Sequence, residues 1–248
     1  YIGMAAFQNC ISLTSITLPN GITSISNQTL KGCTALTSIA LPNSVTTIGD
    51  WAFNSCTNLT SIALSSNLST IGVSAFEACE SLTSISLPNG VTSIKTATFK
   101  ECTALTSITL PSSLTTIEDW AFDSCTNLSY ISAEMTKPPT INTNHFEDVN
   151  ISNCTLEVPA SSFSTYKSAY MWNRFGGIVG KFSLGDTFTV DSIKYKVTDL
   201  ATKTVEVIQN SYKQVNMVIP ETATYAGNTF SVTGIGSAAF YECSALKS

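Results

Sequence analysis

Six cysteines at a constant spacing are the residues of this sequence with the clearest capacity for chemistry. They are Cys10, Cys33, Cys56, Cys79, Cys102 and Cys125, each 23 residues from the next. A cysteine in such a series can be a disulfide partner, a metal ligand, a nucleophile or a buried apolar residue. Metal binding needs further ligands nearby, and the sequence has no C-x-x-C pair or neighbouring histidine to supply them.

The positions around the cysteines recur with the same step of 23 residues. Five units open with L-T-S-I-x-L, usually followed by proline, and continue through a second isoleucine to A-F-x-x-C or a close variant. A strict period of this length is typical of a solenoid, in which each repeat forms one coil and packs on its neighbours. The sequence therefore predicts a repeat solenoid with coils over residues 1–158.

The first half of a coil is expected to contain two short extended segments. In the unit that begins at residue 36, Ile39 and Leu41 are two apart and share one face of a strand. Pro42 ends this strand, because proline cannot donate to a ladder. The second segment, V-T-T-I, buries Val45 and Ile48. We expect parallel ladders along the solenoid from both segments.

The second half of a coil, D-W-A-F-N-S-C in this unit, fits a single helical turn. Asp50 is then placed to cap the turn, and Ala52, Phe53 and Cys56 face inward. We expect these turns on the side of the solenoid opposite the strands.

Packing is the favoured role for the cysteines. Coils in a parallel ladder are about 4.8 Å apart, and cysteine side chains in one file point the same way rather than toward each other. An oxidised pair is the remaining alternative. In the degenerate sixth unit Val149 follows Phe146 by three and takes the cysteine position, which a packing role tolerates and a redox role does not.

These residues resemble the BspA-like leucine-rich repeat family, whose units read approximately L-x-x-I-x-L-P-x-x-V-T-x-I-G-x-x-A-F-x-x-C. Residues 36–58, LTSIALPNSVTTIGDWAFNSCTN, match at nearly every defined position, while Ser65 replaces proline and Thr29-Leu30 replace Ala-Phe. The resemblance implies a curved right-handed solenoid without catalytic activity. It also implies an exported or surface-attached protein of host-associated anaerobic bacteria or parasitic protists, linked to adhesion and to binding host or bacterial proteins.

The repeat pattern loosens after residue 128. The stretch EMTKPPTINTNHF keeps Ile141 and Phe146 five apart and predicts a final coil, and TLEVP at 155–159 predicts one more strand. Residues 161–175 read as an amphipathic helix with Phe163, Tyr166 and Tyr170 along one side. Such a helix suits a cap over residues 159–180, so that 1–180 forms one domain. An aromatic binding patch is the alternative.

Residues 181–248 form the second predicted domain, rich in β-structure. Alternation in 192–198 and 204–209 predicts a hairpin, and TATYAGNTFSV predicts a smaller one. The repeat motif then resumes as Ile235, Phe240, Cys243 and Leu246. We expect an opening cap followed by the first half-repeat of a further array.

Composition excludes several functions. Charged residues make up 12% of the 248 residues, the net charge is −5, and no basic run is present, which argues against nucleic acid. No apolar stretch is long enough for a bilayer. The one histidine, His145, is expected in a structural or surface role, and no G-x-S-x-G or phosphate-binding glycine loop is present. Acidic neighbours such as Glu118-Asp119 are expected to diverge. We therefore expect no enzyme activity, metal or cofactor.

The outward positions of the first strand are the second set of candidate residues. They are Ser15, Thr17, Ser38, Ala40, Ser61, Ala63, Ser84, Ser86, Ser107 and Thr109, with Tyr130 and Ser132 at the end. Such a flat, nearly uncharged array suits a plain solvent-facing strand or a platform for a protein or glycan partner. Alanine interrupts the array, which disfavours an ice-binding surface. Trp51 and Trp120, three coils apart on the turn side, are candidates for partner contact or for half-buried packing.

The function expected from the sequence is a non-catalytic, exported or cell-surface module for adhesion or protein interaction. Its partner is an unknown protein or glycan, with host extracellular matrix among the candidates. A structural spacer without a ligand is the alternative. Residues 235–248 match residues 2–15 at eight of 14 positions, which also predicts head-to-tail self-association through open coils. We expect any signal segment to lie outside these 248 residues, because Tyr1 opens in the middle of a repeat motif.

Overall fold

A computed structural model of the protein describes residues 1–141, 143–209, 217–241, 243, 244 and 246. The chain divides into two compact units. The first contains Tyr1–Val158 and Ser164–Ile178, and the second contains Pro159–Phe163 and Val179–Ser248.

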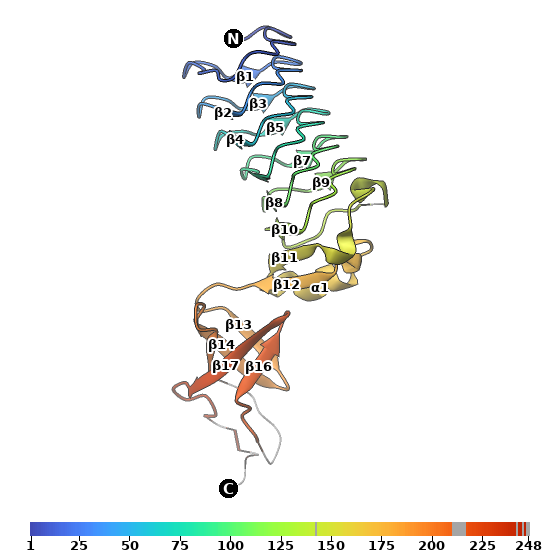
Figure 1. The fold of residues 1–248 in the computed structure, drawn as a ribbon. Helices are drawn as coiled ribbons and strands as arrows, with labels where there is room; N and C mark the ends of the chain where they lie inside the picture. Colours follow the sequence, from blue (N-terminus) through green and yellow to red (C-terminus); the bar gives the residue numbers. More distant parts are fainter. Residues whose placement is uncertain (142, 210–216, 242, 245, 247–248) are drawn as a thin grey trace. The chain divides into compact units, whose positions relative to one another are not determined.

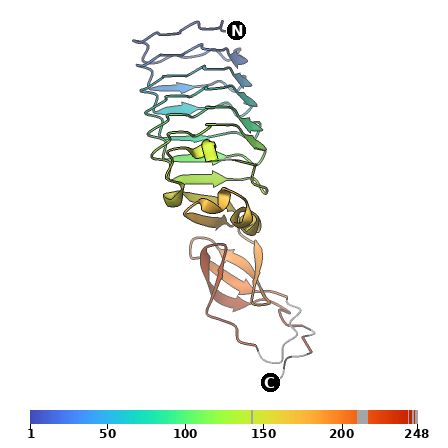
Figure 2. The ribbon, with the colours of Figure 1, turned by 90° about the vertical axis from the view of Figure 1, so that its right-hand side faces the viewer.

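The first unit is a solenoid of stacked coils with parallel strands, as predicted (Figures 1 and 2). The first strands of the coils are β2 (Ser38–Ala40), β4 (Ser61–Ala63), β6 (Ser84–Ser86), β8 (Ser107–Leu110) and β10 (Tyr130–Ala133). The second strands are β1 (Ser24–Ile25), β3 (Thr47–Ile48), β5 (Thr70–Ile71), β7 (Ser93–Ile94) and β9 (Thr116–Ile117). The four coils that begin at residues 36, 59, 82 and 105 thus each contribute one short strand to each of two sets of ladders.

The register of the strands follows the repeat. Ser38 lies opposite Ser61, and Ser84 lies opposite Ser107, so equivalent residues are neighbours along each ladder. The isoleucines of the first strands face the interior: Ile39, Ile85 and Ile108 are buried, and Ile62 is half-buried. Because identical side chains stack on one another, a single 23-residue pattern builds the whole core.

The turn side differs from the expected helical turn: residues 50–55 form successive turns. Two non-glycine residues in this stretch, Trp51 and Ser55, have positive φ of 54° and 58°. As a result, the backbone N–H groups of residues 51, 53 and 55 donate to the carbonyl oxygens of residues 73, 75 and 77 in the next coil at 2.8–2.9 Å. A helical turn would direct these donors back within the segment and leave the coils unconnected on this side.

Asp50 also has a different role from the cap expected. Its Oδ1 accepts the backbone N–H of Val73 in the next coil at 2.8 Å, and its own N–H donates to Oδ1 of Asn27 at 3.0 Å. The side chain therefore links neighbouring coils rather than capping its own turn.

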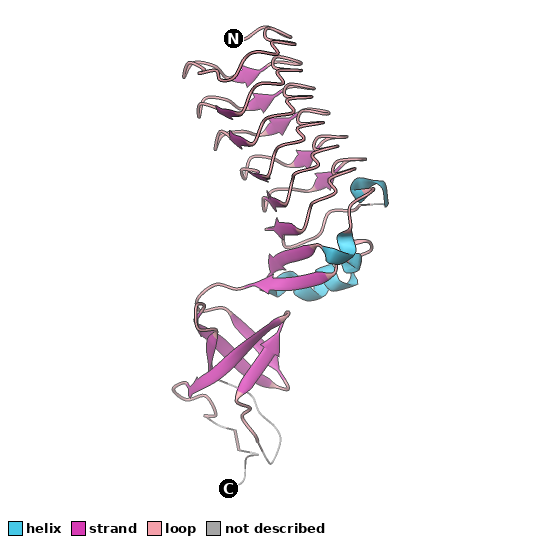
Figure 3. Ribbon diagram, in the orientation of Figure 1, coloured by secondary structure: helices cyan, strands magenta, loops and turns pink. Residues whose placement is uncertain are grey.

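The chain after residue 142 departs from the repeat, and all helical segments lie in this part of the sequence (Figure 3). In chain order the elements are η1 (Thr143–Phe146), η2 (Ile151–Asn153), β11 (Thr155–Pro159), η3 (Ala160–Ser162), α1 (Phe163–Ser168), η4 (Trp172–Arg174) and β12 (Gly177–Lys181). Strands β12, β11, β10, β8 and β6 form one sheet in that order. The final loosened coil is confirmed, since Ile141 and Phe146 are buried, as are Leu156 and Val158 of the predicted strand.

The predicted helix over 161–175 is wrong in length. Helix α1 ends at Ser168, and Met171 with a φ of 65° redirects the chain. Tyr170 is therefore 71% exposed, while Trp172 is fully buried instead. The Tyr166 hydroxyl donates to the Met135 carbonyl oxygen at 3.1 Å and buries its ring against the last coil. Trp172 Nε1 donates to the carbonyl oxygen of Pro139 at 2.8 Å, so two buried aromatic side chains hold this segment on the coil.

The second unit contains a five-stranded sheet with the order β13-β14-β15-β17-β16. Its strands are β13 (Thr187–Val190), β14 (Ile193–Asp199), β15 (Thr204–Val207), β16 (Thr222–Tyr225) and β17 (Asn228–Ile235). Both predicted hairpins are confirmed, because β14 pairs antiparallel with β15 and β16 pairs antiparallel with β17. The core of this unit includes the buried Phe188, Tyr195 and Phe230.

Strand β17 pairs in parallel with β15 and then enters the resumed repeat motif. The N–H of Gly236 donates to the Val207 carbonyl oxygen at 2.7 Å, as the N–H of Gly49 donates to Ile25 at 2.8 Å. The N–H of Cys243 donates to the Phe240 carbonyl oxygen at 3.1 Å. In a regular coil the N–H of Cys56 donates to the Phe53 carbonyl oxygen in the same way, at 3.2 Å. The described residues of this segment therefore adopt the conformation of half a coil; residues 242, 245, 247 and 248 of the expected half-repeat lie outside the described residues.

Candidate functional site

The cysteine file lies inside the solenoid. Cys33, Cys56, Cys79, Cys102 and Cys125 are fully buried free thiols. Each thiol donates to a carbonyl oxygen 26 residues earlier, as from Cys56 to Leu30 at 3.2 Å and from Cys125 to Phe99 at 3.0 Å. Sequence reasoning did not find these bonds, because they join the thiol to the backbone of the preceding coil.

Burial makes these thiols unreactive. It raises the pKa of Cys56 to about 12, with a further contribution from Cys33, and raises the pKa of Cys125 to about 12. The thiolate is the nucleophile and metal ligand, so a raised pKa suppresses both functions. Cys10 is the exception to the buried file, because it belongs to the first coil of the structure and is exposed.

We call the outward positions of the first strands the first-strand face. Its residues are Ser15, Thr17, Ser38, Ala40, Ser61, Ala63, Ser84, Ser86, Ser107, Thr109 and Tyr130, of which Ser15 and Thr17 precede the first strand that the structure contains at these positions, β2. Those from Ser15 to Ser86 are exposed, Ser107 and Thr109 are half-buried, and Tyr130 is exposed. Ser132, expected on the same face, is instead buried, because β11 covers it and its hydroxyl donates to Glu157 Oε2 at 3.1 Å.

The end of the first-strand face carries a polar group that the sequence did not reveal. Glu157 of β11 lies in register with Ser132 of β10, and Tyr130 lies two residues before Ser132. Burial raises the pKa of Tyr130 to about 12, and its hydrogen bond to Glu157 and the charge of that carboxylate add to the shift. A tyrosine, a serine and a carboxylate thus form one hydrogen-bonded group where the uncharged array ends.

A neighbouring column of hydroxyls has a structural role. Thr60 and Thr106 donate through Oγ1 to the carbonyl oxygens of Thr37 and Thr83, both at 3.0 Å. These bonds run from each coil to the one before it. These threonines therefore connect coils, which supports a structural role for this column.

The two tryptophans on the turn side differ in exposure. Trp120 is 43% exposed, whereas Trp51 is half-buried. Both occupy the positive-φ position of their coil, with φ of 56° and 54°. Trp120 is thus available for contact to a greater extent than Trp51, and the two stand three coils apart as expected.

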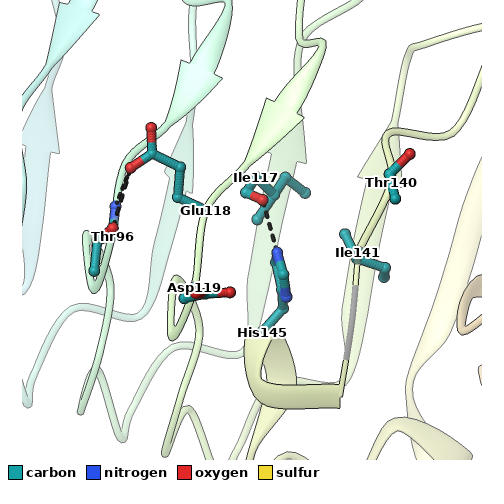
Figure 4. A pocket seen from close by; sticks show the side chains of 7 residues that line it. All are labelled: Thr96, Ile117, Glu118, Asp119, Thr140, Ile141 and His145. Carbon is teal, nitrogen blue, oxygen red and sulfur yellow. Dashed lines mark hydrogen bonds between the residues drawn. The ribbon is translucent and has the colours of Figure 1, made fainter.

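A surface pocket of about 380 Å³ lies on the first unit beside the last regular coil (Figure 4). Its lining residues are Thr96, Ile117, Glu118, Asp119, Thr140, Ile141 and His145. His145 is buried, and its Nε2 lies 2.7 Å from the carbonyl oxygen of Ile117. A carbonyl oxygen only accepts, so Nε2 carries the proton. His145 therefore has a structural bond, in agreement with the expectation from sequence.

The two acids of this pocket diverge, as expected for sequence neighbours. Glu118 points toward Thr96 and Asp119 toward His145 (Figure 4). Burial raises the pKa of Glu118, but hydrogen bonds from Lys95 and Thr96 outweigh burial and hold this pKa below its ordinary value. Glu118 accepts from Lys95 Nζ at 2.8 Å and from the Thr96 backbone N–H at 3.0 Å. The arrangement does not pair the two carboxylates for acid–base chemistry.

Within the described part of the chain, no three His, Cys, Asp or Glu side chains gather as they would around a metal ion. The same residues include no helix with the length and apolarity needed to cross a membrane.

Comparison with known proteins agrees with the geometry. The family model described as BspA type leucine rich repeat region matches residues 1–105 and 92–173, with six copies. These matches span more than half of the chain, which therefore belongs to this family. No curated protein matches the chain.

Several solved structures are similar to this chain, and two of them are described as leucine-rich repeat proteins. A T. pallidum leucine rich repeat protein is 34% identical over 52% of this chain and 60% of that chain, with a TM-score of 0.51. A leucine-rich repeat protein from Bacteroides ovatus is 26% identical over 63% of this chain and 52% of that chain, with a TM-score of 0.48. The pneumococcal vaccine antigen PcpA is 16% identical over 68% of this chain and 48% of that chain, with a TM-score of 0.50. The chain thus spans less than two thirds of the length of each.

Proposed function

We propose that this BspA-type leucine-rich repeat chain is a non-catalytic protein-interaction or adhesion module that acts outside the cell or at its surface. Its partner is a protein or glycan, with host extracellular matrix among the candidates. Membership of the repeat family supports an interaction role, and the buried, unreactive cysteines and the divergent acids support a role without catalysis.

The observation that carries this proposal is the first-strand face. Along β2, β4 and β6 its outward residues are serine and alanine, all exposed and none charged. The centre of a protein interface is depleted in charged residues, because covering a charge without a partner is costly. A flat, uncharged surface over several coils meets this requirement.

The test is a binding assay with immobilised extracellular matrix proteins and with bacterial surface protein. Saturable binding that weakens at least tenfold in Ser61→Glu and Ser84→Glu supports the proposal. Thr70→Glu is the matched control, because Thr70 is exposed on the second strand of the coil that contains Ser61. If no immobilised partner is retained, a spacer without a ligand is favoured instead.

Trp120 distinguishes the two sides of the solenoid in the same assay. Loss of binding in Trp120→Ala with no effect of Ser61→Glu would transfer the binding surface to the turn side. Trp51→Ala is expected to lower stability more than Trp120→Ala, because Trp51 is more buried.

We also propose that residues 1–180 and 181–248 are separate domains, the second being an opening cap with the first half of a further array. The coil-like hydrogen bonds of the described residues after β17 support this proposal. Limited proteolysis tests it, since cleavage in the mostly exposed segment 182–186, directly after β12, should release two stable fragments. Head-to-tail self-association stays a prediction, which light scattering over a concentration series measures.

A further inference from the structure

Trp120 is the largest exposed side chain on the turn side of the described coils, and it is 43% exposed. The same position holds Gln28, Ser74 and Ala97 in three other coils, and all four residues have a φ between 51° and 58°. The coil therefore folds with small or polar residues at this position, and its packing does not require an exposed indole. Tryptophan is enriched among the residues that contribute most to binding at protein interfaces.

Acidic residues lie beside Trp120 on the two neighbouring coils. The N–H of Asp123 donates to the carbonyl oxygen of Trp120 at 3.1 Å, so residues 120–123 form a turn whose ends are within about 7 Å. The N–H of Glu101 in the preceding coil donates to the carbonyl oxygen of Asp123 at 2.8 Å. In the following coil the carbonyl oxygen of Glu147 accepts the N–H of Ser124, also at 2.8 Å. Residues of three coils thus meet in one area of the turn side.

Much of the negative charge in this area is not neutralised. The Nζ of Lys100 lies 2.6 Å from Oδ2 of Asp123, so this lysine pairs with an acid that is itself buried. The hydrogen bond to Asp123, and then the charges of Asp123 and Glu101, raise the pKa of Lys100. Glu101, Glu147 and Asp148 are exposed, and in the described part of the chain Glu101 and Glu147 have no ion-pair partner. The area around the indole is therefore acidic and accessible.

Trp51 provides an internal comparison, because it occupies the same position three coils earlier. The residues that correspond to the acids beside Trp120 are Gly32 for Glu101, Asn54 for Asp123, Glu77 for Glu147 and Ala78 for Asp148. One acid thus remains near Trp51, and it accepts a hydrogen bond from Asn54 Nδ2 at 3.2 Å. The acidic surroundings therefore belong to Trp120 and are not a general property of the repeat.

We propose that the turn side around Trp120 binds an arginine-containing basic segment of a partner protein. The guanidinium group is planar, stacks on aromatic faces and matches the geometry of a carboxylate, so one segment can use both the indole and the exposed acids Glu101 and Glu147. Complementary charge also speeds association and disfavours acidic partners. This inference goes beyond the proposed function, because it concerns a second surface whose chemistry differs from that of the uncharged first-strand face.

The experiment uses a short peptide, acetyl-Gly-Arg-Gly-Arg-Gly amide, added to the full chain at low ionic strength. The readout is the NMR signal of the Trp120 indole N–H, which is assigned by its loss in Trp120→Phe. The matched control peptide has citrulline in place of each arginine, which keeps the shape and removes the charge. We expect a saturable shift with the arginine peptide, at least tenfold weaker binding of the citrulline peptide, and no shift of the Trp51 indole signal. Added salt should weaken the binding, because it screens exposed charges.

Variants assign the binding to this surface. The double variant Glu101→Gln with Glu147→Gln should bind the arginine peptide at least tenfold more weakly. Glu221→Gln, at an exposed acid of the second unit, is the matched control and should bind as the parent chain does. Trp120→Ala removes the reporter, so calorimetry measures its affinity, and a loss of at least tenfold is expected. These positions are exposed, so the variants should fold, and thermal unfolding checks that they do.

Several outcomes would overturn the inference: no saturable shift, equal affinity for the citrulline peptide, an equal shift of the Trp51 signal, or unchanged affinity in either the double variant or Trp120→Ala. A shift of the Trp120 signal with chain concentration in the absence of peptide would also overturn it, because a second copy of the chain would then occupy the surface. Failure of the proposed function is separable, since Ser61→Glu and Ser84→Glu test the first-strand face and should leave binding of the peptide unchanged.

Discussion

The thiol of Cys79 donates a hydrogen bond of 3.2 Å to the carbonyl oxygen of Phe53 in the preceding coil. The same oxygen accepts the backbone N–H of Cys56, also at 3.2 Å. A carbonyl oxygen has two lone pairs, and both are used here. The cysteine therefore fills the core and also connects neighbouring coils, which explains how one residue type serves every regular repeat.

Thiol labelling should separate Cys10 from the buried cysteines. Iodoacetamide attacks the thiolate, and burial raises the pKa of Cys56 to about 12 while excluding the reagent. In the native chain Cys10 should be labelled within minutes, whereas Cys56 and Cys79 should be labelled only after unfolding. Mass spectrometry of peptides measures both rates. Native labelling of Cys79 at the rate of Cys10 would contradict the buried file.

The phenylalanine stack should contribute strongly to stability. Phe99 is fully buried, with ring centroids 5.6 Å from Phe76 and 5.7 Å from Phe122. Phe99→Ala should lower the free energy of unfolding by about 3–5 kcal/mol, through lost burial and a cavity. Phe7→Ala is the matched control and should cost less, because Phe7 is half-buried in the first coil. Denaturant unfolding measures both, and equal losses would refute a continuous stack.

The aromatic segment after the last coil should depend on one hydroxyl. Tyr166→Phe leaves the Met135 carbonyl oxygen without its donor at 3.1 Å and should lower stability by about 1 kcal/mol. Tyr170→Phe is the control and should change nothing measurable, because Tyr170 is 71% exposed. Thermal unfolding of the two variants side by side gives the comparison. Similar melting temperatures for both would show that the hydrogen bond is unimportant.

Acid should weaken the link between Glu118 and the coil before it. Hydrogen bonds from Lys95 and Thr96 outweigh burial and hold the pKa of Glu118 below its ordinary value of 4.5. The folded chain then binds fewer protons than the unfolded chain, so this stabilisation is present above pH 4.5 and is lost as the pH falls through the lowered pKa.

Glu118→Gln should therefore flatten the acid side of the stability profile, measured by denaturant unfolding between about pH 3 and pH 7. Glu80→Gln, at an exposed position of the turn side, is the matched control. A profile of Glu118→Gln that keeps the full slope of the parent chain would contradict this assignment.

The departures of the structure from the predicted turn side have one cause. Residues 49–56 have the spacing of a helical turn, but the N–H groups of residues 51, 53 and 55 bond to the next coil. The carbonyl oxygens of the next coil compete with those of the same turn for these donors. The sequence of a single repeat does not reveal this competition. Asp50 illustrates the same point, because its apparent cap position is used to bond Val73 of the following coil.

The segment after the last coil, residues 161–175, shows a second limit of prediction from sequence periodicity. Phe163, Tyr166 and Tyr170 have helical spacing, yet the chain turns at Met171 and buries Trp172. Its indole hydrogen bond to Pro139 closes a contact 33 residues apart, and helical periodicity carries no information on such a contact. Ser132 is likewise buried because β11 and Glu157 cover it, although its position in the repeat is outward.

The sequence by itself determined the solenoid, the inward positions of each coil and the hydroxyl array of the first-strand face. It did so because every coil repeats the same 23-residue pattern and packs on its neighbours. Each inward residue of one coil therefore packs against the equivalent residue of the next coil. Only the tertiary structure decided what happens where that period fails: the direction of the turn-side donors, the burial of Ser132 and Trp172, and the pocket beside His145. At those places the contacts join residues whose separation the repeat does not specify, and side chains outside the period compete for the same donors and the same buried space.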